Sequence, residues 1–222
     1  MKNRINKKTI KNIIVISLAV LFLMFSLMTY IGATTTPQVA LLPDSIDQIP
    51  QAWITSTPAL HNGLASKPIH IQSHTSFVSN GALACVNTAA ANITVLGFGK
   101  LIFHESTYHS ITTYPLKNNL SQITAINGPV GGYVAETHGY LVNGKLTEGD
   151  ININTRYAFV ATNPSSSQYH LPTVLMHEFG HVIGINHNTT DTKSIMYPTI
   201  PTGSVSRSFV TFDINCLKIL YP

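Results

Sequence analysis

Residues 175–188, LMHEFGHVIGINHN, hold three of the ten histidines of the chain and one of its four glutamates. On a helix, His177 and His181 are four positions apart and lie above one another on one face, close enough to bind one metal ion. Glu178 lies about 100° further round the helix. It is therefore poorly placed as a third ligand, but it can reach a water molecule that the metal holds. The alternative explanation is an ordinary amphipathic helix that runs into a polar loop.

A glycine after the second histidine lets the chain turn back toward the same metal. Gly184 tolerates the positive φ that commonly ends a helix, and His187, three residues later, can then approach from the loop. Three neutral imidazoles leave the fourth position of a tetrahedral zinc ion to a water molecule, whose pKa falls to about 7. On the chain's own residue frequencies, H-E-x-x-H arises by chance in roughly 1% of such sequences, and the two further residues reduce this to the order of 10⁻⁵. The sequence therefore predicts a catalytic zinc site.

The elements that must position these residues are short helices and short strands. Apolar spacing predicts helices over about 80–96, 172–183 and 212–220, the second of which carries the site. Between Gly, Pro and Asn turns, five stretches have the composition of strands: PIHIQSHTSFV (68–78), GKLIFHES (99–106), SQITAI (121–126), YVAETHGYLV (133–142) and GDININTRYAFV (149–160). This order predicts a mixed α/β (α+β) domain with its sheet on one side.

The zinc motif also carries a family resemblance. HEFGHVIGINH (177–187) matches the extended motif of the metzincin metallopeptidases, H-E-x-x-H-x-x-G-x-x-H, and SIMYP (194–198) resembles their Met-turn in the form seen in matrixins, the matrix-metalloproteinase type. FDINCLKILYP (212–222) is similar to the matrixin terminal helix, and EGDININT (148–155) is similar to the strand before their active-site helix. The resemblance covers most of 67–222. It implies a metzincin-like zincin fold, with a twisted mixed five-stranded sheet, an active-site helix and a C-terminal helix.

The resemblance implies a role for each residue of the motif. His177, His181 and His187 would bind one catalytic zinc ion, and Glu178 would be the general base. Met196 would form the apolar floor beneath the histidines, although a buried methionine by itself indicates only core packing.

The resemblance also implies where a substrate would lie. Tyr197 and Pro198 would line the pocket for the side chain after the scissile bond, and residues 199–210 would form the loop that shapes this pocket. The stretch GGYVAETHGY (131–140) would be the edge strand along which an extended peptide pairs.

The sequence departs from the matrixin pattern at several positions, and these departures limit which matrixin properties are expected of this chain. Asn188 stands where matrixins usually have serine, and Pro198 stands where some metzincins have a tyrosine that binds zinc. The cysteine-containing switch peptide of matrixin propeptides is not found in the sequence, so latency by that switch is not expected. Neither the ligands of a structural zinc site nor a clear calcium loop is found, so the sequence supports one catalytic Zn²⁺ and no structural Ca²⁺ or second Zn²⁺.

The N-terminus predicts export. Residues 13–31 are nineteen positions without a charge, just long enough to cross a bilayer as a helix. Five of the thirteen basic residues precede them, which favours a cytoplasmic N-terminal side and a chain that is secreted or membrane-anchored outside the cytoplasm. Whether 1–33 is a cleaved signal peptide or a retained signal anchor stays open. The remaining eight basic residues face nine acidic ones, so the net charge of +4 is no evidence for a nucleic-acid partner.

The rest of the chain divides by composition. Residues 34–66 contain four prolines and no sustained period, which is typical of a stalk or short pro-segment, and 67–222 would be the catalytic domain. In an oxidising compartment Cys85 and Cys216 are expected to form a disulfide. The alternative is two buried free thiols that pack as small hydrophobes.

Two further pairs of histidines are candidates for a second metal site. His70 and His74, and His104 and His109, lie in extended or turn-like segments, where such spacing does not make side chains converge. We interpret them as surface or cross-strand histidines.

These observations predict an exported zinc metalloendopeptidase, a monomer that acts on protein or peptide substrates. It would contact the membrane through residues 13–31 if these are not cleaved. The alternative is an exported binding or adhesion module that keeps zinc without catalysis. Structural zinc sites usually have four protein ligands, whereas only three converge here.

Overall fold

The computed structural model describes residues 62–79, 81–128, 131–205 and 208–222. All of them belong to one compact unit. The predicted segment 1–33, including the apolar stretch 13–31, and residues 34–61 of the predicted segment 34–66 lie outside the described residues. Within the described ranges, no helix has both the length and the apolar character needed to cross a membrane.

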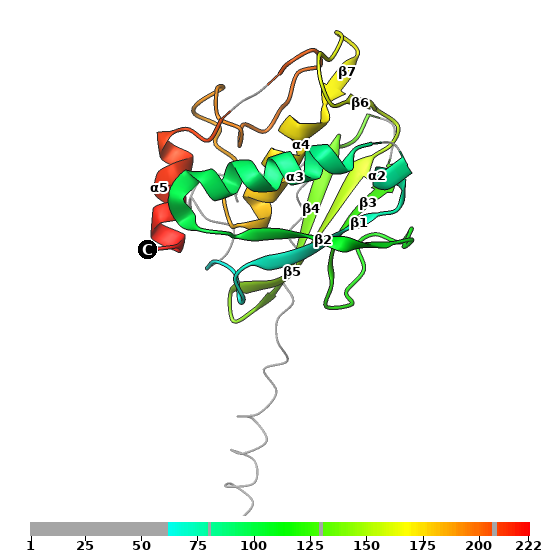
Figure 1. The fold of residues 1–222 in the computed structure, drawn as a ribbon. Coiled ribbons are helices and arrows are strands. Elements are labelled where there is room, and N and C mark those ends of the chain that lie inside the picture. The colour runs from blue at the N-terminus through cyan, green and yellow to red at the C-terminus, as the bar shows by residue number, and fades with distance from the viewer. Residues whose placement is uncertain (1–61, 80, 129–130, 206–207) are drawn as a thin grey trace, which may run out of the picture. The chain divides into compact units, whose positions relative to one another are not determined.

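A five-stranded sheet in the order β2-β1-β3-β5-β4 forms the framework of the fold (Figure 1). All neighbours are parallel except β4 and β5, which are antiparallel. The strands are β1 (Ile69–His74), β2 (Ile102–His109), β3 (Ser121–Ile126), β4 (Ala135–Val142) and β5 (Lys145–Asn154). The predicted mixed five-stranded sheet is therefore confirmed, and so is the position of 135–140 on an edge strand.

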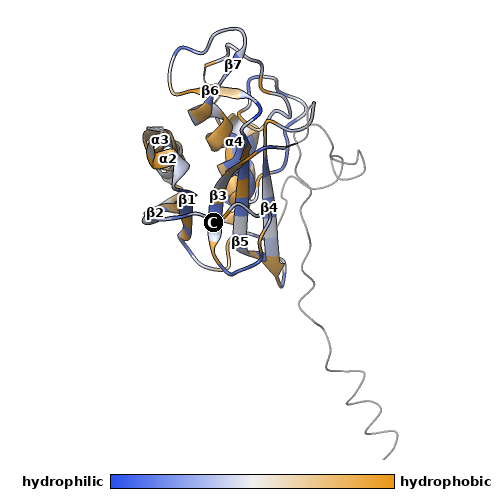
Figure 2. Cartoon of the chain, turned by 90° about the vertical axis from the view of Figure 1, so that its right-hand side faces the viewer, coloured by the Kyte–Doolittle hydropathy of each residue, from blue (hydrophilic) through white to orange (hydrophobic). Residues whose placement is uncertain are grey.

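Two long helices cover one face of this sheet (Figure 1). Helix α3 (Leu83–Ile93) continues into a π-helical turn, η2 (Thr94–Phe98), and contacts β2, whereas α4 (Leu171–Val182) contacts β4 and β5. Figure 2 shows α4 coloured as hydrophobic where it lies beside the strands. The α4 residues Val174, Leu175 and Phe179 are fully buried, and burial of such side chains contributes roughly 1.5–3 kcal/mol each.

The remaining elements are short. Helix α5 (Thr211–Leu220) ends the chain, and α2 (Ser76–Ser79) follows β1 in a stretch for which extended structure was predicted. Strands β6 (Ala158–Val160) and β7 (Gln168–His170) form a separate two-stranded sheet. Strand β7 was not predicted, because three residues are too few to show a period.

Strand β5 is buried on both faces, although every second residue near its end is polar. Ile151 and Ile153 enter the core, while Glu148 and Asp150 lie on the opposite face and are only 1% and 2% exposed. These two carboxylates accept backbone N–H groups of residues 116–122, a segment that covers this face. The hydrogen bonds offset part of the loss of hydration that burial of a carboxylate entails.

Residues 62–65 join the sheet before β1 begins. Asn62 N–H donates to Gly144 O at 2.7 Å, and Leu146 N–H donates to Gly63 O at 3.0 Å. These residues precede position 67, where the sequence places the start of the catalytic domain, and they fasten the chain to the β4–β5 hairpin.

The expected disulfide between Cys85 and Cys216 is not formed, and both cysteines are free and buried. Cys85 lies in the first turn of α3, whereas α5, which carries Cys216, packs against η2 at the other end of that helix (Figure 1). Nine residues of helix separate these ends by roughly 14 Å, and a disulfide needs Cα atoms within about 7 Å. The alternative of two buried thiols is the one observed, and burial raises the pKa of both.

Candidate metal centre

Helix α4 carries the first two histidines of the motif on one buried face. It spans Leu171–Val182, one residue from the predicted bounds, and has proline in its first turn, where the missing N–H breaks no helical hydrogen bond. His177 and His181 are 0% and 1% exposed. The regular helix therefore places both imidazoles on one side, as their spacing predicts.

A tight turn at the end of α4 brings the third histidine back. Gly184 has φ of 99°, a conformation that residues with a Cβ rarely adopt. Gly184 N–H donates to His181 O and Ile185 N–H donates to Gly180 O, both at 2.9 Å. His187 then lies 7% exposed beside the other two. The predicted role of Gly184 in ending the helix is confirmed.

The three imidazoles present the same nitrogen to a common point. His177 Nε2 lies 3.0 Å from His181 Nε2 and 3.2 Å from His187 Nε2. Their ligand atoms all lie within 4.8 Å of one another. Nitrogens bound at roughly 2.0–2.1 Å to one tetrahedral zinc ion are about 3.3 Å apart. The donor set and its spacing therefore fit a zinc ion.

Backbone carbonyls fix the tautomer of two ligands. His177 Nδ1 lies 2.7 Å from Ile195 O, and His181 Nδ1 lies 2.8 Å from Ile185 O. A carbonyl only accepts, so each Nδ1 carries the proton and each Nε2 lone pair is directed to the centre. For His187, burial and then the nearby His181 lower the pKa to about 2, which keeps this imidazole in the neutral form that binds metals.

Glu178 lies between the two helical histidines in sequence and contacts strand β4. It is 1% exposed, and Thr137 Oγ1 donates to its Oε2 at 2.7 Å. The carboxylate is thus held by β4, and its place in the sequence next to His177 is the one in which the resemblance expects a general base. Sequence reasoning did not identify Thr137, because this contact joins residues 41 positions apart.

Met196 packs beneath the histidine-bearing helix in a tight turn. It is 0% exposed, its N–H donates to Ser194 Oγ at 2.9 Å, and its O accepts from Asn188 N–H at 2.8 Å. A Cβ built on Gly180 would lie 2.2 Å from Met196 Sδ. The Met196 side chain can therefore lie against α4 in this conformation only because residue 180 is glycine.

A buried carboxylate joins this turn to α5. Asp213, 0% exposed, accepts from Ser194 Oγ at 2.6 Å, from Val210 N–H at 2.9 Å and from Asn188 Nδ2 at 3.2 Å. Because Ser194 also accepts from Met196 N–H, the C-terminal helix is connected to the floor of the metal centre. Apart from the unusual Asn188, no local pattern in the sequence indicated this network.

The predicted substrate-pocket residues follow the turn directly. Tyr197 and Pro198 are half-buried, and their role in a pocket stays a prediction. The loop after them is tied to the β6–β7 region, since Thr202 Oγ1 donates to Ser166 O at 2.7 Å and Gly203 N–H donates to Gln168 O at 3.0 Å.

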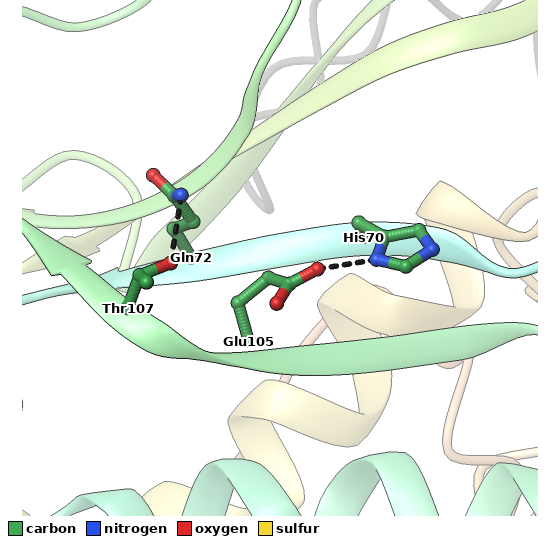
Figure 3. Close-up of polar contacts among 4 residues, drawn as sticks. All are labelled: His70, Gln72, Glu105 and Thr107. Carbon is green, nitrogen blue, oxygen red and sulfur yellow. Dashed lines mark hydrogen bonds and ion pairs between the residues drawn. The ribbon is translucent and has the colours of Figure 1, made fainter.

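The remaining histidine pairs lie on strands β1 and β2. His74 and His109 are register partners with ring centroids 5.5 Å apart, and His104 bonds Ser73 and Asn87. Figure 3 shows His70 beside Glu105, next to the contact between Gln72 and Thr107. Among the described residues, the triad in α4 and its following loop is the one group of three or more such side chains that converges on a metal position. The interpretation as cross-strand histidines is confirmed.

Comparison with known proteins places this centre in a family. The family model described as Matrixin matches residues 88–222, which include the three histidines, Glu178 and Met196. "Metalloendoproteinase 1" of Glycine max is 36% identical over 62 residues, 28% of this chain and 20% of that protein. "Metalloendoproteinase 2-MMP" of Arabidopsis thaliana is 39% identical over 51 residues, 23% of this chain and 13% of that protein. The matched stretches thus span a fifth or less of these relatives.

Proposed function

The chain belongs to the matrixin family, whose model matches more than half of it, and from this premise we propose that it is an exported zinc-dependent endopeptidase. The observation that carries the proposal is the convergence of three buried histidine nitrogens from a helix and the loop after it, with the buried Glu178 next to His177 in the sequence. A zinc ion bound there supplies Lewis-acid charge, which makes water nucleophilic near neutral pH and polarises a peptide carbonyl.

Each residue of the site then has a separate role in the proposed reaction. His177, His181 and His187 hold the zinc ion through Nε2. Glu178 takes up a proton from the attacking water and delivers it to the departing amine. Met196 supports the histidines from below and, through Ser194, is linked to α5.

We propose that the substrate lies extended along strand β4. This strand is at the edge of the sheet and contacts α4, so its outer backbone groups can pair with an extended peptide. Tyr197, Pro198 and the loop 199–210 would then contact the side chain after the scissile bond. The substrate class is protein or peptide, and we propose that the enzyme acts as a monomer.

Peptide cleavage tests the proposal. The purified protein would be incubated with an unbiased peptide library as prepared, after chelation, and after zinc is added back. We expect internal cleavage that chelation removes and zinc restores. Stoichiometric zinc without cleavage would favour the binding or adhesion module instead.

Export is supported by the sequence of 1–33, with its basic start and apolar stretch 13–31. We propose that the catalytic domain lies outside the cytoplasm, either secreted or anchored by this segment. N-terminal sequencing of the mature protein, together with fractionation of the producing cells, distinguishes the two forms. Recovery of the intact chain in the cytoplasm would contradict export.

A further inference from the structure

The hydroxyl of Thr137 is directed at the carboxylate of Glu178. Thr137 Oγ1 lies 2.7 Å from Glu178 Oε2 and 3.3 Å from Glu178 O. Both side chains are buried, at 2% and 1% exposure. We propose that Thr137 is a positioning residue that holds the general base of this centre, an inference that rests on the proposed peptidase function.

The fold explains why position 137 has this role. Thr137 pairs with Ile151 of β5, whose fully buried side chain belongs to the core that α4 covers. Side chains alternate along a strand, so those of Glu136 and His138 lie on the opposite face. Within these three residues of β4, Thr137 is therefore the one whose side chain faces Glu178.

The hydrogen bond restricts a side chain that is otherwise adaptable. A glutamate has three rotatable bonds, and a general base must be within about 2.6–3.2 Å of the proton that it takes up. A hydroxyl that donates to a carboxylate in a water-poor interior makes a strong bond. With Oε2 bonded to Thr137, the carboxylate has a fixed orientation, and its other oxygen exchanges the proton with water.

If Thr137 has a purely structural role, a different result is expected. In that case its hydroxyl only joins β4 to α4, and loss of the hydroxyl lowers stability without a specific effect on turnover. Thr137→Val keeps the branched shape and removes the donor, whereas Thr137→Ser keeps the donor. Thr124→Val is a matched control: Thr124 is also 2% exposed, and its hydroxyl bonds Ile151 O and Asn152 Oδ1, both at 3.1 Å, away from Glu178.

The experiment compares these three variants with the unmodified protein. Turnover, KM, the zinc dissociation constant by chelator competition and the unfolding temperature are measured for each. We expect Thr137→Val to lower kcat roughly 10- to 100-fold, with KM and zinc affinity within about threefold. Thr137→Ser recovers kcat to within about threefold, and Thr124→Val lowers only the unfolding temperature.

Three results would overturn the proposal. The first is that kcat of Thr137→Val stays within threefold of that of the unmodified protein. The second is that Thr137→Ser lowers kcat as much as Thr137→Val does, and the third is that Thr137→Val changes only KM or zinc affinity.

A binding measurement separates this proposal from the peptidase function itself. Acetohydroxamate chelates zinc, and its hydroxyl proton can pass to a neighbouring carboxylate. If no peptide is cleaved, the peptidase proposal fails, but calorimetry with zinc-loaded protein still reports on Glu178. We then expect Thr137→Val to weaken acetohydroxamate roughly tenfold and Thr137→Ser to leave it unchanged. Equal acetohydroxamate affinity in Thr137→Val, Thr137→Ser and the unmodified protein would contradict the role of Thr137.

Discussion

Met196 packs directly on the backbone of Gly180, so closely that a Cβ at position 180 would lie 2.2 Å from Met196 Sδ and 2.9 Å from its Cε. Gly180 immediately precedes His181, and Met196 immediately follows Ile195, whose carbonyl accepts from His177. The turn beneath the centre is therefore fitted to the helix that carries two of the ligands. A methyl group at position 180 would therefore require the end of the Met196 side chain to shift.

Gly180→Ala is expected to displace Met196 and the turn around it. Overpacking of a buried site lowers stability by typically about 1–3 kcal/mol, and zinc affinity should fall because the Ile195 carbonyl moves away from His177. Denaturant unfolding of the zinc-free protein and chelator competition measure the two effects. Unchanged stability and unchanged zinc affinity would show that the contact relaxes without consequence.

Asp213→Ala is expected to loosen the connection between α5 and the turn. Three donors, from Ser194, Val210 and Asn188, lose their shared buried acceptor, and each buried donor left without a partner costs about 1–3 kcal/mol. Asp191→Ala is the control, because Asp191 accepts one backbone N–H at a half-buried position. Equal unfolding free energies for the two variants would contradict a central role for Asp213.

Asp150 gives stability a predictable dependence on pH. Burial is the main cause that raises the pKa of this carboxyl from 3.8 to about 7 in the folded protein. Between these values the folded state binds more protons than the unfolded state, so this group lowers stability as pH rises from about 4 to about 7. Above pH 7 its effect is constant.

Asp150→Asn tests this effect directly. The substituted amide does not titrate, so the decline in unfolding free energy between pH 4 and 7 should be shallower than in the unmodified protein. Three units of pKa correspond to a difference on the order of 4 kcal/mol across this range. Denaturant titrations at several pH values measure both slopes, and parallel curves would rule out Asp150 as the source.

Removal of zinc is expected to destabilise the protein, because the ion binds only the folded arrangement of the three histidines. Free zinc at 100 times its dissociation constant adds about 2.7 kcal/mol. His187→Ala should abolish most of this gain, whereas His70→Ala, at an exposed position on β1, should retain it. Thermal unfolding with and without chelator measures the difference, and a gain that survives in His187→Ala would place the ion elsewhere.

Local patterns in the sequence predicted much of the fold and the ligands. The period of residues 172–183 located α4 to within one residue, and Gly184 indicated where it ends, because both depend on neighbours a few positions away. The resemblance placed 131–140 at an edge of the sheet, and β4 lies there.

Contacts between distant segments could not be predicted in this way. The bond from Thr137 to Glu178 spans 41 residues and that from Asn188 to Asp213 spans 25, and both depend on how strands and helices pack. The expected disulfide was wrong for the same reason. Cysteine count and compartment favour pairing, but tertiary packing decides that α5, which carries Cys216, contacts η2 and not the first turn of α3, where Cys85 lies.

The most direct test of the central claim is Glu178→Gln, measured for bound zinc and for peptide turnover in the same preparation. The amide keeps the shape of the side chain but cannot take up a proton from water. We predict stoichiometric zinc, as in the unmodified protein, with kcat lower by roughly 10²- to 10⁴-fold. Zinc retained together with near-normal turnover would contradict the assignment of Glu178 as the general base.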